Sequence, residues 1–166
     1  MNEIISNGKE VIRIEAEAIA DLQNSINEDF VNTVETIFAS KGRVVLTGMG
    51  KSGLIARKIV ATLNSTGTAA IYLHPTDALH GDLGMVRSED VVILISKSGE
   101  TEEISNLLPM LKRMNVKLIS MCGNKESKLA RECDLFLNIA VKEEACPYDL
   151  APTASTTATL ALGDAL

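Results

Sequence analysis

The sequence contains no tryptophan, only two tyrosines and three phenylalanines, and no long uninterrupted apolar run. A membrane-spanning helix needs about 20 consecutive apolar residues, so no such segment is predicted. The start, Met1-Asn2-Glu3-Ile4, does not resemble a signal peptide, and we expect a cytoplasmic protein. Hydrophobic residues still make up 46% of the chain, so the core must consist of Ile, Val, Leu and Ala, a mixture typical of layered α/β folds.

The chain also lacks a cationic block and a metal-binding pattern. Its net charge is -6 and it has no run of five Lys or Arg residues, which disfavours nucleic acid and anionic membranes as partners. The number of cysteines is odd, and none of the three, Cys122, Cys133 and Cys146, stands in a CxxC spacing. His74 and His80 complete no zinc-binding pattern with them. We therefore expect reduced thiols, no metal and no cofactor.

At 166 residues the chain is predicted to form a single domain, residues 1–166. Helical periodicity covers residues 8–40 with a break near Asn27, and a final Ala- and Leu-rich helix covers 153–166. Between them, in the sheet core 43–140, strands are predicted to alternate with helices at 43–47 (strand), 52–64 (helix), 69–73 (strand), 91–96 (strand), 102–114 (helix), 117–121 (strand), 125–132 (helix) and 135–140 (strand). This alternation predicts a three-layer α/β/α sandwich with a five-stranded parallel sheet of flavodoxin-like order.

The segment Ser96-Lys97-Ser98-Gly99-Glu100-Thr101 follows the apolar run 91–95, which is typical of a buried parallel strand. Hydroxyls and free backbone N–H groups at a strand-to-helix turn form a site for phosphate. The alternative is an N-cap in which Ser98 or Thr101 satisfies the first amides of the helix. Capping needs only one hydroxyl, whereas three converge here, so we favour phosphate binding.

A second glycine-rich turn, Gly48-Met49-Gly50-Lys51-Ser52-Gly53, matches GxGxxG between a strand and a helix. A dinucleotide site would require an acidic residue after the next strand, which instead ends at Leu73-His74-Pro75. A P-loop would require glycine at position 45, where valine stands. Both nucleotide interpretations are weakened, and the remaining hypothesis is a tight turn that presents Lys51 and Ser52 to an anion.

Together with Glu143-Glu144-Ala145-Cys146-Pro147 and His80-Gly81-Asp82-Leu83-Gly84-Met85, these turns give the chain a resemblance to a known family. The chain resembles SIS (sugar isomerase) domains, and within them the arabinose 5-phosphate isomerases. The resemblance implies interconversion of D-ribulose 5-phosphate and D-arabinose 5-phosphate, a step toward the sugar acid Kdo of lipopolysaccharide and capsules. It also implies a homo-oligomer, as a tetramer, with a small sugar phosphate as its ligand.

The resemblance further implies roles for individual residues. Its catalytic residues correspond to Lys51, Glu103, Glu144 and His80, and its substrate-binding residues to Gly50, Ser52, Ser96, Ser98, Gly99 and Thr101. A carboxylate would move the proton between C1 and C2, while a lysine would stabilise the developing oxyanion.

Each catalytic candidate has an ordinary structural alternative. Glu103 could be an acid of the first helical turn, favoured by the helix dipole, Glu144 a charge in a loop, and His80 a loop histidine bonded to backbone. The family continues beyond this point with further helices, including a His-Pro-Gly-Gly segment, and usually a pair of CBS domains. The last predicted helix reaches Leu166 without a stop signal, so we expect a truncated chain with impaired turnover. The alternative function is a sugar-phosphate-binding regulatory domain without catalysis.

Overall fold

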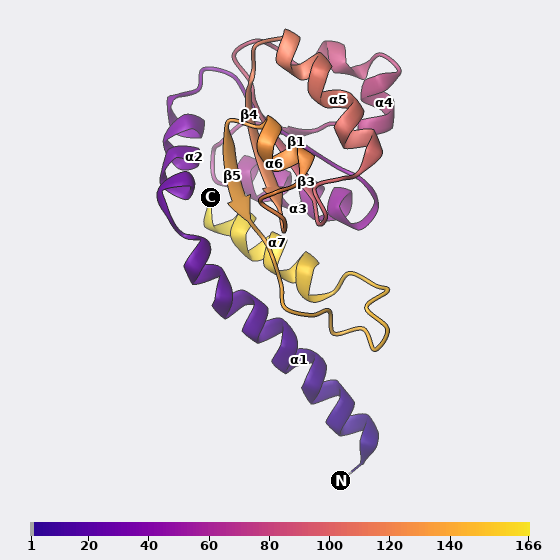
Figure 1. Ribbon diagram of the computed structural model, residues 1–166. Coiled ribbons are helices and arrows are strands. Elements are labelled where there is room, and N and C mark those ends of the chain that lie inside the picture. Colours follow the sequence, from indigo (N-terminus) through magenta and orange to yellow (C-terminus); the bar gives the residue numbers. More distant parts are fainter. Residues whose placement is uncertain (1) are drawn as a thin grey trace.

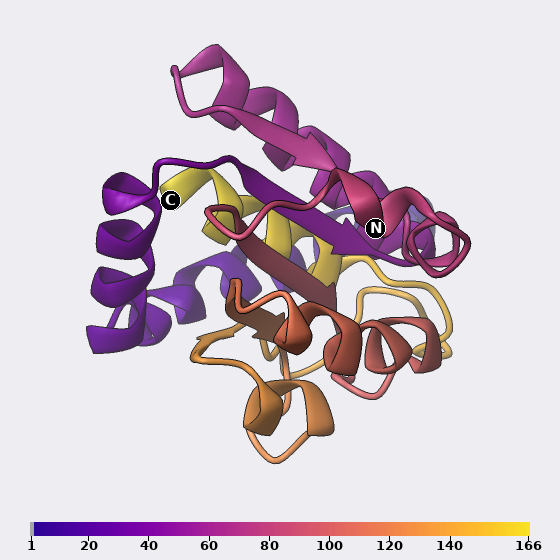
Figure 2. The same ribbon diagram turned by 90° about the horizontal axis from the view of Figure 1, so that it is seen from above.

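The computed structural model describes residues 2–166 and contains one five-stranded sheet with helices over both of its faces (Figures 1 and 2). The strands are β1 (Val44–Gly48), β2 (Ala70–Tyr72), β3 (Val91–Ser96), β4 (Lys117–Cys122) and β5 (Leu135–Asn138). All pairs are parallel and the order is β2-β1-β3-β4-β5. The predicted three-layer fold and its flavodoxin-like strand order are confirmed.

The helical elements are α1 (Glu3–Asp21), the 3-10 turn η1 (Leu22–Ser25), α2 (Glu28–Ala39), α3 (Gly50–Ser65), α4 (Pro75–Leu79), the 3-10 turn η2 (Asp82–Met85), α5 (Glu102–Arg113), α6 (Lys128–Glu132) and α7 (Ala154–Ala165). Helices α1 and α6 begin three or more residues away from their predicted starts, because polar side chains cap them elsewhere. The Asn2 side chain accepts a hydrogen bond from Ile4 N, so α1 begins before the expected residue 8. Ser127 caps α6 through Ala130 N, so that helix begins three residues later than expected.

The strands alternate their side chains between two apolar layers, as their period of two requires. In β3, Ile93 and Ile95 belong to the cluster formed with α3 and α7, whereas Val92 and Leu94 belong to the cluster formed with α4, α5 and α6. The exposed fraction of these four side chains is at most 1%. The middle strand is therefore covered on both faces, and polar chemistry is confined to its ends.

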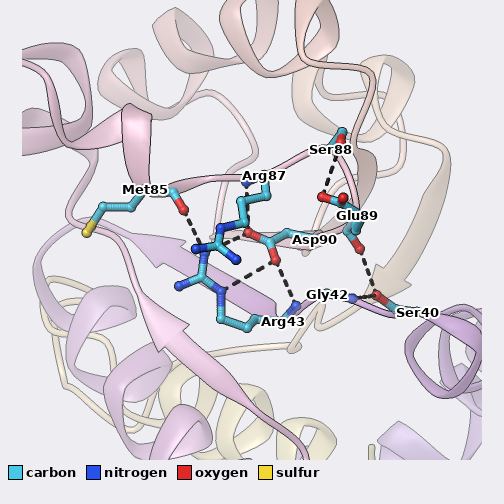
Figure 3. Close-up of polar contacts among 8 residues, drawn as sticks. All are labelled: Ser40, Gly42, Arg43, Met85, Arg87, Ser88, Glu89 and Asp90. Carbon is cyan, nitrogen blue, oxygen red and sulfur yellow. Dashed lines mark hydrogen bonds and ion pairs between the residues drawn. The ribbon is translucent and has the colours of Figure 1, made fainter.

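Asp90 ties together three segments at the edge of the sheet where the strands begin (Figure 3). Its carboxylate accepts hydrogen bonds from Arg43 N (2.7 Å), Arg43 Nη2 (3.0 Å) and Arg87 N (2.9 Å), and Arg43 Nη2 also donates to Met85 O. Burial opposes ionisation of Asp90, but the Arg43 guanidinium and the two amides outweigh it and hold the pKa of this carboxyl below its usual value. The ion pair thereby fixes the starts of β1 and β3 and the end of η2.

Helix α1 packs against α7 along part of its length and extends beyond the rest of the molecule toward its N-terminal end (Figure 1). Ala18 on the packed side is 7% exposed, whereas Ile12 on another side is 68% exposed. None of the helices described in residues 2–166 combines the length and apolar character needed to cross a bilayer. Within the described part of the chain, no element thus covers the apolar outward face of α1.

Candidate functional site

The two glycine-rich turns of the sequence lie side by side at the carboxyl edge of the sheet. β1 and β3 are neighbours, and Gly48 at the end of β1 pairs with Ile95 near the end of β3. The chain continues from β1 into α3 on one face of the sheet and from β3 into α5 on the other. This is the topological switch point of an open α/β sheet, where a ligand crevice is expected.

The turn after β3 is held in shape by its own hydroxyls. Ser96 Oγ lies 2.8 Å from Thr101 Oγ1 and accepts a hydrogen bond from Gly99 N (3.0 Å). Ser98 Oγ accepts from Glu100 N (3.1 Å). Gly99 has φ +72°, and a Cβ there would run into the Ser127 side chain, so this position requires glycine. The predicted substrate-binding residues of this turn are therefore preorganised on one loop.

The helices that begin at these two turns lack a side-chain cap. The side chains of Asn2, Asn27 and Ser127 cap α1, α2 and α6. In contrast, no side chain of residues 2–166 caps α3 or α5, even though Thr101 stands at the N-cap position of α5. Capping by Ser98 or Thr101, the alternative interpretation of this motif, is therefore not what the structure shows. Two helix N-termini with unsatisfied amides instead adjoin one crevice, which suits an anion.

Lys51 and Ser52 lie in the first turn of α3, directly after Gly50 with φ +54°. The Lys51 side chain is exposed and makes no ion pair with any residue of the described chain. Ser52 is half-buried. A cation and a hydroxyl are thus available at the uncapped end of α3, as the anion-binding hypothesis for this turn requires.

Glu103 and His80 lie on neighbouring elements of the opposite layer. Glu103 is half-buried in the first turn of α5, and His80 is the exposed residue that follows the last residue of α4, which packs against α5. Neither side chain takes part in a hydrogen bond or ion pair with another of residues 2–166. A carboxylate without a structural partner is available for chemistry, although the helix dipole alone also explains an acid at this place.

Glu144 has a different environment, because its carboxylate is buried between the start of α7 and Lys97. Its Oε2 accepts hydrogen bonds from Thr153 N (2.8 Å), Thr153 Oγ1 (3.1 Å) and Ser155 N (3.1 Å), so Glu144 caps α7. Its Oε1 lies 2.7 Å from Lys97 Nζ. Burial raises the pKa of Glu144, but Lys97 and the donors at the start of α7 outweigh it and lower that pKa to about 2.

Sequence reasoning did not select Lys97, which links the turn after β3 to Glu144 and also approaches Asp149 (3.9 Å). The only signal was its position inside the Ser96–Thr101 motif, because the partner lies far along the chain, beyond β4 and β5.

A cavity of about 500 Å³ adjoins Glu144 and separates it from α1. It is lined by Asn7, Glu10, Val11, Ile14, Glu143, Glu144, Ala145, Cys146 and Pro147. Among residues 2–166, no three His, Cys, Asp or Glu side chains group as metal ligands would.

With this geometry established, comparison with known proteins decides the family. The model of the SIS domain matches residues 37–166, most of the chain. The chain belongs to the SIS domain family. Its resemblance to this family, inferred from the two turns and the Glu144 segment, is confirmed.

Two curated relatives and one solved structure show to which SIS-domain proteins the chain is similar. The chain is 55% identical to arabinose 5-phosphate isomerase KdsD of Shigella flexneri over 159 residues, covering 96% of this chain and 48% of that protein. It is 51% identical to KdsD of Pseudomonas aeruginosa over 164 residues, covering 99% of this chain and 50% of that protein. The chain spans about half the length of these curated relatives. The structure of Escherichia coli CFT073 c3406 in complex with arabinose 5-phosphate matches with a TM-score of 0.94 and 47% identity, over 99% of this chain and 89% of that one.

Proposed function

We propose that this SIS domain interconverts D-ribulose 5-phosphate and D-arabinose 5-phosphate as an aldose–ketose isomerase. The observation that carries the proposal is the pair of uncapped helix N-termini, α3 and α5, which meet at the switch point beside the hydroxyls of Ser96–Thr101. Such a crevice binds a phosphate group and leaves the sugar at the carboxyl edge of the sheet. The identity to KdsD proteins and the likeness to a structure bound to arabinose 5-phosphate support this choice of sugar phosphate.

In the proposed reaction a base removes the proton at the carbon beside the carbonyl, and an enediol carries it to the neighbouring carbon. Glu103 is the better candidate for this base, because its carboxylate has no structural partner within the described chain. Lys51 at the start of α3 would stabilise the negative charge that develops on oxygen. His80 would act at the sugar from the end of α4. No metal or organic cofactor takes part in this scheme.

The second candidate is a sugar-phosphate-binding regulatory domain without catalysis. It is favoured by the contacts of Glu144: if this buried carboxylate, bound to Lys97 and to α7, serves the fold alone, it takes no part in proton transfer. In this case the phosphate crevice would be retained, whereas proton transfer would not occur. Binding without turnover distinguishes this candidate from the isomerase.

The direct test is incubation of the intact gene product with arabinose 5-phosphate, followed by detection of ribulose 5-phosphate. We expect conversion, and we expect Lys51→Met to lower kcat about 10²-fold or more, the range of oxyanion stabilisation. Lys125→Met is the matched control, because Lys125 is an exposed lysine outside both turns. D-Arabinose without the phosphate should not be converted. Binding of arabinose 5-phosphate without conversion would reject the isomerase in favour of the regulatory domain.

We infer that the protein acts as a cytoplasmic homo-oligomer, with a tetramer as the expected form. Three unpaired cysteines agree with a reducing compartment. Ile5, Ile12 and Ile19 recur every seven residues along the outward face of α1, and each is more than 40% exposed. A stripe with this period is typical of helices that pack against another helix. In the cell the arabinose 5-phosphate would enter Kdo synthesis, as the family resemblance implies.

The oligomer is tested by light scattering after size-exclusion chromatography. Ile12→Glu should reduce the assembled mass, because it places a charge in the apolar stripe. Ala20→Glu is the matched control, since Ala20 is exposed on the same helix but outside the stripe. A monomeric wild-type protein, or equal effects of the two substitutions, would contradict the role given to α1.

A further inference from the structure

The ion pair between Lys97 and Glu144 connects two segments that sequence reasoning treated separately. Lys97 follows Ser96 in the turn after β3, and its carbonyl oxygen accepts a hydrogen bond from Gly123 N (2.9 Å), which holds its backbone. Its ammonium reaches across to Glu144 Oε1 at 2.7 Å. The turn that offers hydroxyls to the phosphate is thereby joined to the segment that leads into α7.

Lys97 is the partner on which one oxygen of this carboxylate depends. Three donors serve Glu144 Oε2, whereas Oε1 is shielded from solvent, accepts no hydrogen bond from residues 2–166 and has Lys97 as its neighbouring cation. The Glu144 side chain is 1% exposed, but that of Lys97 is 47% exposed. A buried carboxylate that loses its counter-charge either takes up a proton or moves. The Lys97 ammonium itself remains partly hydrated, so its own desolvation cost is small, and the cost of separating the pair falls on Glu144.

The other charges around Glu144 would not replace Lys97. The titratable groups on the elements that face it are Glu10 on α1, Glu143 and Cys146 on its own segment, and Asp149 beside Lys97. α7 contributes the hydroxyls and amides of Thr153 and Ser155, which are neutral. Lys142, two residues before Glu144, is paired with Asp21 at 2.8 Å. Without Lys97, the carboxylate would therefore face only acidic groups and neutral donors among residues 2–166. The position of Oε1 therefore depends on one residue.

We propose that Lys97 is a positioning residue for Glu144: it holds the Glu144 carboxylate ionised and turned toward the Ser96–Thr101 turn, and so couples the phosphate site to the start of α7. The catalytic consequence rests on the proposed isomerase function. Lys97 does not need to touch the sugar for this role. It acts through the orientation and charge of Glu144, while the neighbouring hydroxyls bind the phosphate.

The first test measures Glu144 itself, by NMR titration of the 13C-labelled glutamate carboxyl groups, with Glu144→Gln to assign the signal. In the wild type the carboxyl should stay ionised down to about pH 3, because its pKa lies at about 2. Lys97→Met should move the midpoint up by about 1–3 pH units, the effect of removing one close opposite charge. Lys97→Arg should restore the wild-type titration, since it keeps the charge.

Lys112→Met is the matched control for the loss of a surface lysine. Lys112 is 46% exposed and forms an ion pair with Glu132 on α6, away from the two turns, and Glu132 is itself 39% exposed. This substitution should leave the Glu144 titration unchanged. An unchanged midpoint in Lys97→Met, or an equal shift in Lys112→Met, would overturn the proposal.

The second test measures the pH profile of kcat in the intact gene product with arabinose 5-phosphate. Lys97→Met should move the acidic limb of the kcat–pH profile to higher pH. It should also lower kcat by a larger factor than it changes KM. Lys97→Arg should restore the wild-type profile. An active enzyme whose profile does not move would overturn the positioning role even if the NMR midpoint shifts. A wild type without isomerase activity would instead reject the proposed function, while the titration still decides whether Lys97 governs Glu144.

Discussion

The hydroxyls of Ser96 and Thr101 lie 2.8 Å apart and form a hydrogen bond across the turn after β3. Ser96 is 2% exposed, so this bond is protected from water. It directs the Thr101 hydroxyl toward Ser96 and away from the amides of α5, which leaves that helix uncapped. Thr101 stands where a capping residue would stand. In this protein it closes the loop instead, and the N-terminus of α5 stays open to a ligand.

Thr101→Val should weaken phosphate binding while the fold is retained. The substitution keeps the shape of the side chain but removes the hydroxyl that closes the turn. We expect about a tenfold loss of affinity for arabinose 5-phosphate, the lower end for a hydrogen bond associated with a charged group. Isothermal titration calorimetry measures this effect. Thr66→Val is the control, because its hydroxyl bonds Thr62 O at the opposite end of α3, and an equal loss there would contradict the assignment.

Glu103→Gln should lower kcat far more than it changes KM. If Glu103 is the base, its loss should reduce kcat by about 10²–10⁴-fold, the usual contribution of general acid–base catalysis. Steady-state kinetics with Glu102→Gln provide the comparison, since Glu102 lies in the same turn of α5 and has the same relation to the helix dipole. Equal kinetics for both variants would leave Glu103 as a helix-dipole residue.

Gly99→Ala should destabilise the protein and disrupt the phosphate turn. The backbone at Gly99 is left-handed, which costs an alanine about 1–2 kcal/mol, and the added Cβ meets the Ser127 side chain. We expect the free energy of unfolding in urea to fall by at least about 2 kcal/mol. Gly8→Ala should instead gain about 0.5–1 kcal/mol, because Gly8 lies within α1 with open space around it. A neutral Gly99→Ala would show that the turn adapts.

Asp90→Asn should reduce stability near neutral pH by about 2 kcal/mol, because it removes the charge of a buried carboxylate that accepts hydrogen bonds from Arg43 and Arg87. The pKa of Asp90 is lower in the folded protein than in the unfolded chain, so its stabilising effect is present above the unfolded value. It is lost as the pH falls through the folded value. The difference between wild type and Asp90→Asn, measured by urea denaturation, should therefore narrow below about pH 4. A difference independent of pH would show that the charge is not the cause.

The fold could be predicted because its signals are local. The apolar run 91–95 is hydrophobic at every position, which is typical of a strand covered on both faces. Alternation of such runs with helical periods leads to a parallel sheet, and even the interior Pro109 did not end the predicted helix. Helix starts were less predictable, because Asn2 and Ser127 cap α1 and α6 at places that periodicity does not reveal.

For the candidate site, the sequence by itself determined which chemical groups are present and that they follow strand ends. The two turns are each continuous in the chain, so their hydroxyls and Lys51 were found from spacing alone. Only the tertiary structure decided what these groups do, because hydrogen-bond partners depend on positions that the chain brings together from afar. It directed Thr101 to Ser96 instead of the α5 amides, and it committed Glu144 to Lys97 and α7. A buried carboxylate needs hydrogen-bond donors, and these can come from any part of the chain that the fold brings close to it.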